Sequence, residues 1–379
     1  MLYTLPVLTA DDERVLGELS TMRSALADQI RTPRRWVGRL RKTAVARAIQ
    51  GSNSIEGYNV ALDDADAAIE GDEPISADVQ TFREIAGYRQ ALGFILATAG
   101  DENFTLDASI LRSMHYMLLS HALDKSPGQY RRGEIFVSDE ATGRHLYAGP
   151  DADLVAELVD ELMRWTADHP DLDPFVSGAM AHLNLVMIHP FRDGNGRMAR
   201  ALQTLVLTRA GLSAPELSSI EEWLGANTED YYRVLARSSD GTWSPGHDAS
   251  TWVTFSLRAH HLQAQAVLDR VSRASRVWSM LDDLGASQRL PDRSLDVLYS
   301  AALGMRVRRG PYVREAQIDE RTASRDLKLL TDVALLRAVG STKGRHYVAG
   351  PALDAVVAVR RSAAETVDPY PGFRASLYS

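Results

Sequence analysis

One dozen residues constrains this chain more than any other part of it. Residues 189–200 read His-Pro-Phe-Arg-Asp-Gly-Asn-Gly-Arg-Met-Ala-Arg. The stretch before them, 175–188, is apolar and helix-like, and Pro190 disfavours the helical region for His189, so a helix should end there. A second helix should begin near Arg197. The pattern therefore predicts two helices joined by a short, polar, glycine-containing turn.

The turn carries the groups that bind an anion. Gly194 and Gly196 permit a tight backbone turn whose N–H groups share one concavity, and the helix that follows adds its positive N-terminal end. Arg197 and Arg200 are spaced i, i+3, so both guanidiniums reach one side and can fork onto phosphate oxygens. These features predict a polyphosphate site.

Two further side chains of the turn suggest chemistry at that site. The carboxylate of Asp193 would repel phosphates by itself, but it would suit the site if it held a Mg²⁺ that bridges them. His189 then stands beside the polyphosphate as a candidate general base for an incoming hydroxyl.

The dozen resembles the signature of the Fic family, His-x-Phe-x-Asp/Glu-Gly-Asn-Gly-Arg-x-x-Arg, and every constrained position matches. The resemblance implies a helical core and transfer of AMP from ATP to a protein hydroxyl, with release of pyrophosphate. It also implies a role for each signature residue: His189 as the base, Asp193 for Mg²⁺, Asn195 with the N–H groups of Gly194 and Gly196 for the α-phosphate, Arg197 and Arg200 for the outer phosphates, and Phe191 packed inward. The alternative is a plain glycine turn between helices with solvated arginines.

Composition places the chain among ordinary globular proteins. Its 379 residues suffice for two or three domains, and it is 45% hydrophobic and 24% charged. It has no apolar run of membrane-spanning length and no secretory pattern at its start. The absence of cysteine excludes disulfides and fits a cytoplasmic protein. The net charge of −8 argues against a nucleic-acid coat.

Periodicity predicts a mainly α fold with one hairpin in the core. The polar segment 63–78, with Pro74, is expected to be a loop, and a long helix is expected over 250–280. The predicted domains are an N-terminal helical region (1–100), a Fic core with a β-hairpin flap (101–248), a linking helix (249–288), a winged helix-turn-helix-like domain (289–360) and a tail (361–379).

An upstream motif predicts regulation. Ser52-Asn53-Ser54-Ile55-Glu56-Gly57 is similar to the Ser/Thr-x-x-x-Glu-Gly/Asn motif on the inhibitory helix of many Fic proteins. There the glutamate pairs with the last signature arginine, here Arg200. A carboxylate on that guanidinium would remove a phosphate ligand and put negative charge where the γ-phosphate must sit. The alternative is a helix end capped by Gly57 with a solvated Glu56.

Residues 128–150 predict a β-hairpin. A Glu-Ile-Phe-Val run and a His-Leu-Tyr run flank a polar turn containing Gly143. Pro127-Gly128-Gln129-Tyr130-Arg131 precedes it and resembles the Gly-x-Tyr/Phe-Arg element before the Fic flap. In that family the flap registers a target chain by strand addition, which would use Ile135, Phe136 and Tyr147. The alternative is a hairpin that only covers the core.

Aromatic and histidine side chains add three expectations. Asn227-Thr228-Glu229-Asp230-Tyr231-Tyr232 resembles the family segment that borders the nucleotide base, with Tyr231 and Tyr232 for stacking. The alternative is that both tyrosines pack between helices. His182 lies seven residues before His189 and could share a helix face with it, but no third ligand at a recognisable spacing completes a zinc site. Many Fic proteins carry a histidine at the position of His182, so it is interpreted as structural, and His115, in an apolar helix, is interpreted as a hydrogen-bonded core residue.

Residues 289–348 carry 12 Lys/Arg against 7 Asp/Glu, a net of +5, which leaves −13 for the remainder. Three helices and two strands joined by a basic turn are similar to a winged helix-turn-helix, with 322–330 as its recognition helix. Arg321, Arg325 and Lys328 are spaced for phosphate contacts, and Lys343 and Arg345 lie on the wing. The alternative is a domain used for protein docking or dimerisation.

The sequence leaves several functions open. The first is Mg²⁺-dependent AMP transfer from ATP to an unidentified protein target, or to the chain itself, held inactive by Glu56. The second is removal of AMP, or use of another nucleotide, at the same site. The third is a transcriptional regulator that senses a nucleotide. A homodimer through residues 250–280 and a DNA contact through the C-terminal domain are further expectations.

Overall fold

The computed structural model describes residues 1–31, 35–72, 76–138, 145–169, 171–212, 219–341, 344–362 and 364–379. Within them the fold is mainly α, as predicted, with two antiparallel two-stranded sheets. The chain forms two compact units. Unit 1 comprises 1–31, 43–265 and 367–379, and unit 2 comprises 32–42 and 266–366. Helices α2 and α12 contribute residues to both units.

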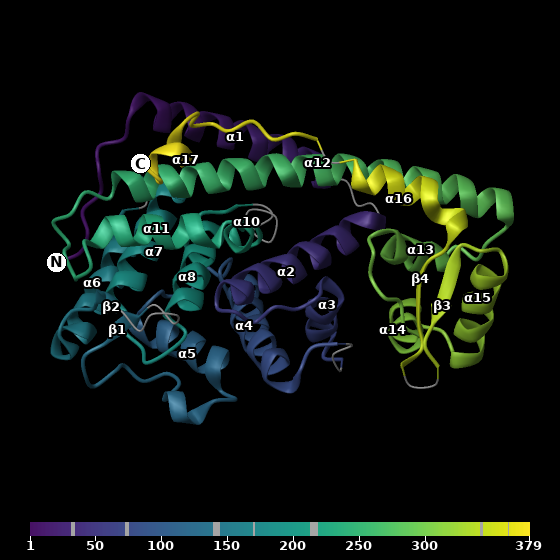
Figure 1. Ribbon diagram of the computed structural model, residues 1–379, viewed down its shortest axis with the longest axis horizontal. Helices are drawn as coiled ribbons and strands as arrows, with labels where there is room; N and C mark the ends of the chain where they lie inside the picture. Colours follow the sequence, from purple (N-terminus) through teal and green to yellow (C-terminus); the bar gives the residue numbers. More distant parts are fainter. Residues whose placement is uncertain are drawn as a thin grey trace. The chain divides into compact units, whose positions relative to one another are not determined.

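Unit 1 is built around two helices. Its helices and strands are α1 (Ala10–Arg31), the second part of α2 (Arg35–Ile55), α3 (Leu62–Glu70), α4 (Val79–Thr98), α5 (Ala108–Leu119), β1 (Phe136–Ser138), β2 (His145–Ala148), α6 (Val155–Asp168), α7 (Pro174–Ile188), α8 (Asn195–Arg209), α10 (Glu221–Ala226), α11 (Thr228–Ser239), the first part of α12 (Ser250–Gln288), and α17 (Phe373–Ser376). Figure 1 shows α7 and α8 among the other helices of this unit.

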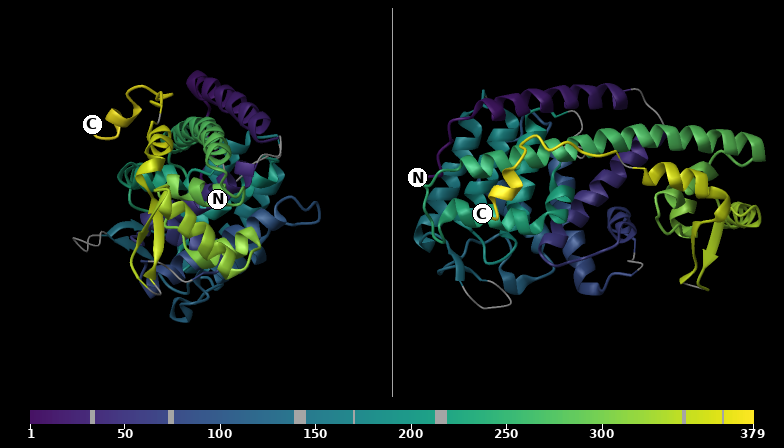
Figure 2. Two further views of the ribbon diagram at one scale, coloured as in Figure 1. Left: turned by 90° about the vertical axis from the view of Figure 1, so that its right-hand side faces the viewer. Right: turned by 45° about the horizontal axis from the view of Figure 1, so that its top comes forward.

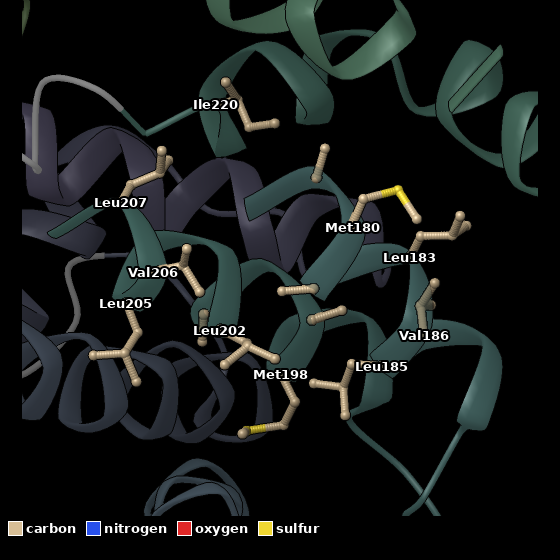
Figure 3. Packing of buried hydrophobic residues seen from close by; sticks show 14 of the residues in the cluster. Met180, Leu183, Leu185, Val186, Met198, Leu202, Leu205, Val206, Leu207 and Ile220 are labelled. Atoms are coloured by element: carbon tan, nitrogen blue, oxygen red, sulfur yellow. The ribbon is translucent and has the colours of Figure 1, made fainter. Parts of the chain in front are cut away.

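The pair α7 and α8 forms the centre of the core. Asp173 caps α7 by accepting the Phe175 N–H at 2.9 Å, and Pro174 occupies the first helical position, where no N–H is needed. Every residue of α7 after Pro174 is buried. Leu185 of α7 and Leu202 of α8 lie in one apolar cluster (Figure 3). The residues between these two helices are therefore held by a close-packed scaffold.

Two glycines bring the surrounding helices unusually close. A Cβ on Gly87 of α4 would overlap the carbonyl of Leu118 in α5, and a Cβ on Gly51 of α2 would overlap the carbonyl of Glu221 in α10. Only glycine permits backbone contact at these points. The packing thus fixes α4 against α5, and the end of α2 against α10.

The predicted hairpin is confirmed. Strands β1 and β2 pair antiparallel, with Phe136 opposite Ala148 and Val137 opposite Tyr147. The outer side of β2 is partly occupied, because Ala148 forms an isolated bridge with Thr242. Gly143 of the expected turn lies outside the described residues.

The expected loop over 63–78 is wrong in its first part, because α3 spans Leu62–Glu70. Its alanines supply a narrow apolar face, and Ala65, Ala67 and Ala68 are buried. The helix ends where Gly71 adopts the left-handed conformation, at φ 74°. The polar composition of residues 63–78 favoured a loop, although its first part forms a helix that buries alanines. Pro74 lies outside the described residues.

The C-terminal segment packs on unit 1. The Tyr370 hydroxyl donates to Asp12 of α1 at 2.8 Å, and Arg258 of α12 pairs with Asp368 at 2.7 Å. Figure 2 shows this segment returning beside α1 and α12. Residues 367–379 of the predicted tail therefore belong to unit 1.

Unit 2 contains the last part of α12, α13 (Ser294–Ala302), α14 (Arg309–Ala316), α15 (Glu320–Asp332), β3 (Leu336–Val339), β4 (His346–Ala349) and α16 (Asp354–Arg361). Val307 bridges to Tyr347 of β4, and β3 packs on α15 (Figures 1 and 2). The order of elements agrees with the expectation, although assignment to the winged-helix class stays a prediction. Helix α12 continues past the expected end at 280.

No helix in the described part of the chain combines the length and apolar character needed to cross a membrane.

Candidate active site

His189 ends α7 and carries a ring nitrogen suited to accept a proton. It adopts the left-handed conformation at φ 51°, as expected of a helix end before Pro190. Its Nδ1 lies 3.0 Å from the Val186 carbonyl oxygen, so Nδ1 carries the hydrogen and Nε2 presents its lone pair. Burial lowers the pKa of His189 from its ordinary value. The ring is therefore neutral at physiological pH, as a general base requires.

The turn after His189 is held by its own side chains. Asn195 accepts from the Phe191 N–H through Oδ1 and donates to the Phe191 carbonyl through Nδ2, each at 2.9 Å. Both polar groups of the amide thus brace the turn, whereas the family resemblance assigns Asn195 to the α-phosphate. Phe191 is fully buried, as predicted, and stacks on His115 with ring centroids 3.7 Å apart.

His115 is a buried structural residue, as interpreted from the sequence. Its Nδ1 accepts from the Gly128 N–H at 2.8 Å, so its Nε2 carries the hydrogen and donates to the Asp193 carbonyl at 3.0 Å. Burial lowers the pKa of His115 to about 4. A neutral imidazole thus joins α5, the segment before the hairpin, and the turn.

The two glycines of the turn have different reasons to be glycine. Gly194 has a positive φ of 77° and precedes α8, which begins at Asn195 rather than near Arg197. Gly196 is helical and does not shape the turn, so that expectation is wrong. A Cβ there would lie 2.6 Å from Glu56 Oε1. Gly196 instead leaves room for a carboxylate above the first turn of α8.

Asp193 offers a carboxylate at the rim of the site. Its Oδ1 accepts from the Gly194 N–H at 2.6 Å, and its Oδ2 lies 3.3 Å from Lys125 Nζ. Burial would raise the pKa of Asp193, but the charges of Arg197 and Lys125 outweigh it and lower that pKa. Among the described residues no cluster of three or more His, Asp or Glu forms a metal site. One carboxylate fits Mg²⁺ that arrives with substrate phosphates.

Arg200 is held by the upstream motif. Its Nη2 lies 2.7 Å from Glu56 Oε1 and donates to the Ser52 carbonyl at 2.9 Å, while its Nε donates to Ser52 Oγ at 2.8 Å. Gly57 follows with φ 85°. Ser52 and Glu56 of the motif therefore contact Arg200 directly, and the solvated Glu56 of the alternative interpretation does not occur.

Arg197 is held by a carboxylate that sequence reasoning missed. Its Nη1 lies 2.5 Å from Oε2 of Glu84 in α4, and both side chains are buried. Burial would raise the pKa of Glu84, but the hydrogen bond and charge of Arg197 lower it below its usual value. The ring of Tyr58 lies 5.6 Å from the same guanidinium. Nothing local in the sequence marks Glu84.

One donor of each signature arginine is buried without a hydrogen-bond partner among the described residues. Arg197 Nε and Arg200 Nη1 are buried and form no hydrogen bond in the part of the chain that the structure describes. Buried donors are nearly always satisfied, so such atoms call for an explanation. Their position on the two signature arginines suits an anion that supplies the missing acceptors.

Arg131 connects the base of the hairpin to the turn that begins at His189. Its Nε donates to the His189 carbonyl at 2.9 Å and its Nη2 to the Pro150 carbonyl at 2.5 Å. Its backbone N–H donates to the Pro190 carbonyl at 2.9 Å. The Gly-x-Tyr-Arg element thus fixes the hairpin beside the turn, a role that its sequence position alone did not reveal.

The three predicted flap residues face different ways. Phe136 is 45% exposed and stacks on His145, while Ile135 is partly buried at the start of β1. Tyr147 is buried and its hydroxyl donates to the Met187 carbonyl at 2.6 Å. Tyr147 therefore anchors the hairpin to α7, whereas Phe136 is accessible to a partner.

The two predicted base-stacking tyrosines also differ. Tyr231 is buried and hydrogen-bonds His182 Nε2 at 3.0 Å, which makes it a core residue in this structure. Tyr232 is 47% exposed, and its hydroxyl donates at 3.3 Å to the carbonyl of Ile55, within the motif of residues 52–57. His182 itself donates to Gln203, as expected of a structural histidine.

The family comparison agrees with this geometry. Residues 105–207 match the Fic/DOC family. The chain contains a Fic domain. The matched range includes α5, the hairpin, α7 and the turn that begins at His189. These elements surround His189.

Curated relatives bear the name protein adenylyltransferase Fic. One from Nematostella vectensis is 30% identical over 207 residues, which is 54% of this chain and 45% of that protein. One from Drosophila melanogaster is 32% identical over 247 residues, which is 64% of this chain and 47% of that protein. The chain thus spans about half the length of the curated relatives it matches.

Solved structures show the same fold. A Fic family protein from Desulfovibrio desulfuricans G20 aligns with a TM-score of 0.57 at 23% identity, over 92% of this chain and 99% of the other. A Fic domain containing signaling protein from Bacteroides thetaiotaomicron VPI-5482 aligns with a TM-score of 0.54 at 22% identity, over 67% of this chain and 97% of the other.

Proposed function

We propose that this protein transfers AMP from ATP to a hydroxyl side chain of a protein target and releases pyrophosphate. The observation that carries the proposal is the Nδ1 contact of His189 with the Val186 carbonyl, which leaves Nε2 free to take a proton. The names of the curated relatives, protein adenylyltransferase Fic, support the same reaction.

The reaction needs one proton acceptor and one phosphate cradle. His189 Nε2 takes the proton of the target hydroxyl as its oxygen forms a bond to the α-phosphorus. The bond from that phosphorus to the pyrophosphate breaks, and Arg197 and Arg200 bind the outer phosphates. Mg²⁺, held by Asp193 with the phosphates, would neutralise part of the charge of the leaving group. The exposed Phe136 and the outer edge of β1 are where an extended target segment would align.

We propose further that Glu56 keeps the enzyme inactive. Its carboxylate occupies Arg200 at 2.7 Å and so takes the place of a phosphate oxygen. Glu56 is only partly buried and follows the last residue of α2, so it can leave without unfolding a helix. Glu56→Gly should therefore release the transferase.

Incubation with ATP labelled at the α-phosphate and Mg²⁺ tests both proposals. Wild type should incorporate little label, and Glu56→Gly much more. Adding His189→Ala to Glu56→Gly should lower incorporation by a factor on the order of 10²–10⁴. Label that persists without His189 would contradict the mechanism, and equal labelling by wild type and Glu56→Gly would contradict inhibition. Labelled GTP, and a pre-labelled target, test the open alternatives of another donor and of AMP removal.

A second candidate function is contact of unit 2 with duplex DNA. Arg321, Ser324, Arg325 and Lys328 form an exposed stripe on α15 at i, i+3, i+4 and i+7. The acidic residues of the helix are engaged within unit 2: Asp326 with Arg293, Asp332 with Lys328, Glu320 with Arg309. Neither Arg321 nor Arg325 has a side-chain partner in the described ranges. Arg345 is also exposed on the hairpin, and Lys343 lies outside the described residues.

Binding of a labelled duplex at several salt concentrations tests this function. A DNA-binding face should give affinity that falls steeply with salt, because phosphate contacts release counterions. Arg321→Ala with Arg325→Ala should weaken binding and reduce the salt slope, whereas Arg276→Ala, an exposed arginine of α12, should not. No binding at low salt would end the proposal. The homodimer and cytoplasmic location expected from the sequence stay predictions.

A further inference from the structure

The carboxylate of Glu84 has more partners than a simple ion pair requires. Its Oε2 lies 2.5 Å from Arg197 Nη1. Its Oε1 accepts from Gln80 Nε2 at 2.7 Å and lies 3.0 Å from His121 Nε2. Gln80 and Arg197 therefore donate to one buried carboxylate, His121 lies beside it, and the carboxylate in turn holds Arg197.

The backbone that carries Glu84 is fixed as well. Gly87, three residues further along α4, packs against the carbonyl of Leu118 with no room for a Cβ. His121 lies two residues beyond the end of α5, so the segment that follows the helix packed on α4 also supplies a side chain at Glu84. A carboxylate on such a framework is not free to swing away from its partner.

The geometry leaves part of the Arg197 guanidinium available. A guanidinium has five N–H donors in a rigid fork, and Glu84 takes one on Nη1. Nε is buried and has no partner among the described residues. The ring of Tyr58 lies 5.6 Å from the guanidinium carbon. The arginine is therefore anchored on one side and unsatisfied on another.

We propose that Glu84 is a positioning residue, which anchors Arg197 so that its remaining donors are preset for the outer phosphates of ATP. This inference rests on the proposed function and deepens it. Glu84 keeps its contact when nucleotide binds, because carboxylate and phosphate use different donors of one guanidinium. It differs in this from Glu56, which competes with phosphate for Arg200. An oriented arginine loses less conformational entropy when the phosphate arrives.

Calorimetry with Mg²⁺ and a non-hydrolysable ATP analogue tests the proposal in the Glu56→Gly background. Glu84→Gln keeps the shape of the side chain but removes its charge, and should weaken nucleotide binding by about tenfold. KM for ATP should rise in parallel, with a smaller change in kcat, because Glu84 acts on binding through Arg197. Unchanged or tighter binding would overturn the proposal.

A double-mutant cycle separates positioning from general damage. Once Arg197→Gln has removed the guanidinium, Glu84→Gln should cause no further loss of nucleotide affinity. An equal loss in both backgrounds would show that Glu84 acts elsewhere and would overturn the inference. Asp12→Asn replaces another buried carboxylate of unit 1, one remote from the signature, and should leave nucleotide affinity unchanged.

Two safeguards keep the test decisive. If thermal scans show that Glu84→Gln is unfolded, Glu84→Asp keeps the charge but shortens the reach, and it should weaken binding in the same cycle; unchanged affinity would refute the proposal. If Glu56→Gly binds nucleotide but transfers no label, the proposed function fails, while the calorimetric cycle still decides the role of Glu84.

Discussion

The two signature arginines are held by carboxylates in different settings. Arg197 meets Glu84, whose side chain is 4% exposed in the middle of α4. Arg200 meets Glu56, whose side chain is 25% exposed just beyond the end of α2. The first pair is part of the core, and the second lies at a helix end beside a glycine. On the proposals above, the ion pair with Glu84 positions Arg197 permanently, whereas the ion pair with Glu56 blocks Arg200 and can be released.

Removal of each carboxylate should cost different amounts of stability. Glu84→Ala leaves a buried guanidinium without its counter-charge and should lower the free energy of unfolding by about 3–5 kcal/mol. Glu56→Ala also leaves a buried guanidinium, but Arg200 keeps its two hydrogen bonds to Ser52 and water can replace the partly exposed Glu56, so the loss should be smaller than for Glu84→Ala. Urea unfolding measures both. Equal losses of unfolding free energy in the two variants would contradict the distinction between the ion pair of Glu84 and that of Glu56.

The pH dependence of transfer should depend on the surroundings of His189, which include Glu56, and should not depend on Glu84. Burial lowers the pKa of His189, while the charge of Glu56 raises it. The base works when neutral, so the acidic limb of kcat/KM for Glu56→Gly should lie below the ordinary histidine value of about 6.5. Adding Glu84→Gln should leave that limb in place. A limb above the ordinary value, or one that moves with Glu84, would contradict this assignment.

The smallest effect should come from Gly57. Its φ of 85° strains any other residue, although a Cβ there would meet no atom within 4 Å. Gly57→Ala should therefore weaken the inhibited conformation by about 1 kcal/mol, which is about fivefold more basal labelling. Gly38→Ala, at a glycine within α2 where a Cβ also meets no atom within 4 Å, is the control and should not raise labelling. Basal activity that stays at the wild-type value would show that inhibition by Glu56 does not depend on this backbone conformation.

Part of the turn after His189 could be predicted, because its residues are consecutive in the sequence. The end of α7 at His189 followed from Pro190, and the inward packing of Phe191 followed from the family resemblance. The contact of Glu56 with Arg200 joins residues 144 apart, and only a recognisable motif made it predictable.

The roles of Glu84 and Gly196 could not be predicted from the sequence. Glu84 reaches Arg197 across 113 residues, and a glutamate on an amphipathic helix gives no sign of its burial. The pattern indicated a turn residue at Gly196, because nothing local shows that the carboxylate of Glu56, the residue after α2, lies where a Cβ would be. Both meanings come from tertiary packing, which a local pattern does not contain. The same is true of α3, whose buried alanines lie within a polar segment.

A crystal structure of Glu56→Gly with Mg²⁺ and a non-hydrolysable ATP analogue would test the distinction between the two carboxylates most directly. The account predicts that Arg200 binds phosphate, while Arg197 binds phosphate and keeps its contact with Glu84 near 2.5 Å. An Arg197 that turns away from Glu84 to reach the nucleotide would contradict it, because Glu84 would then compete with phosphate for Arg197 as Glu56 is proposed to do for Arg200.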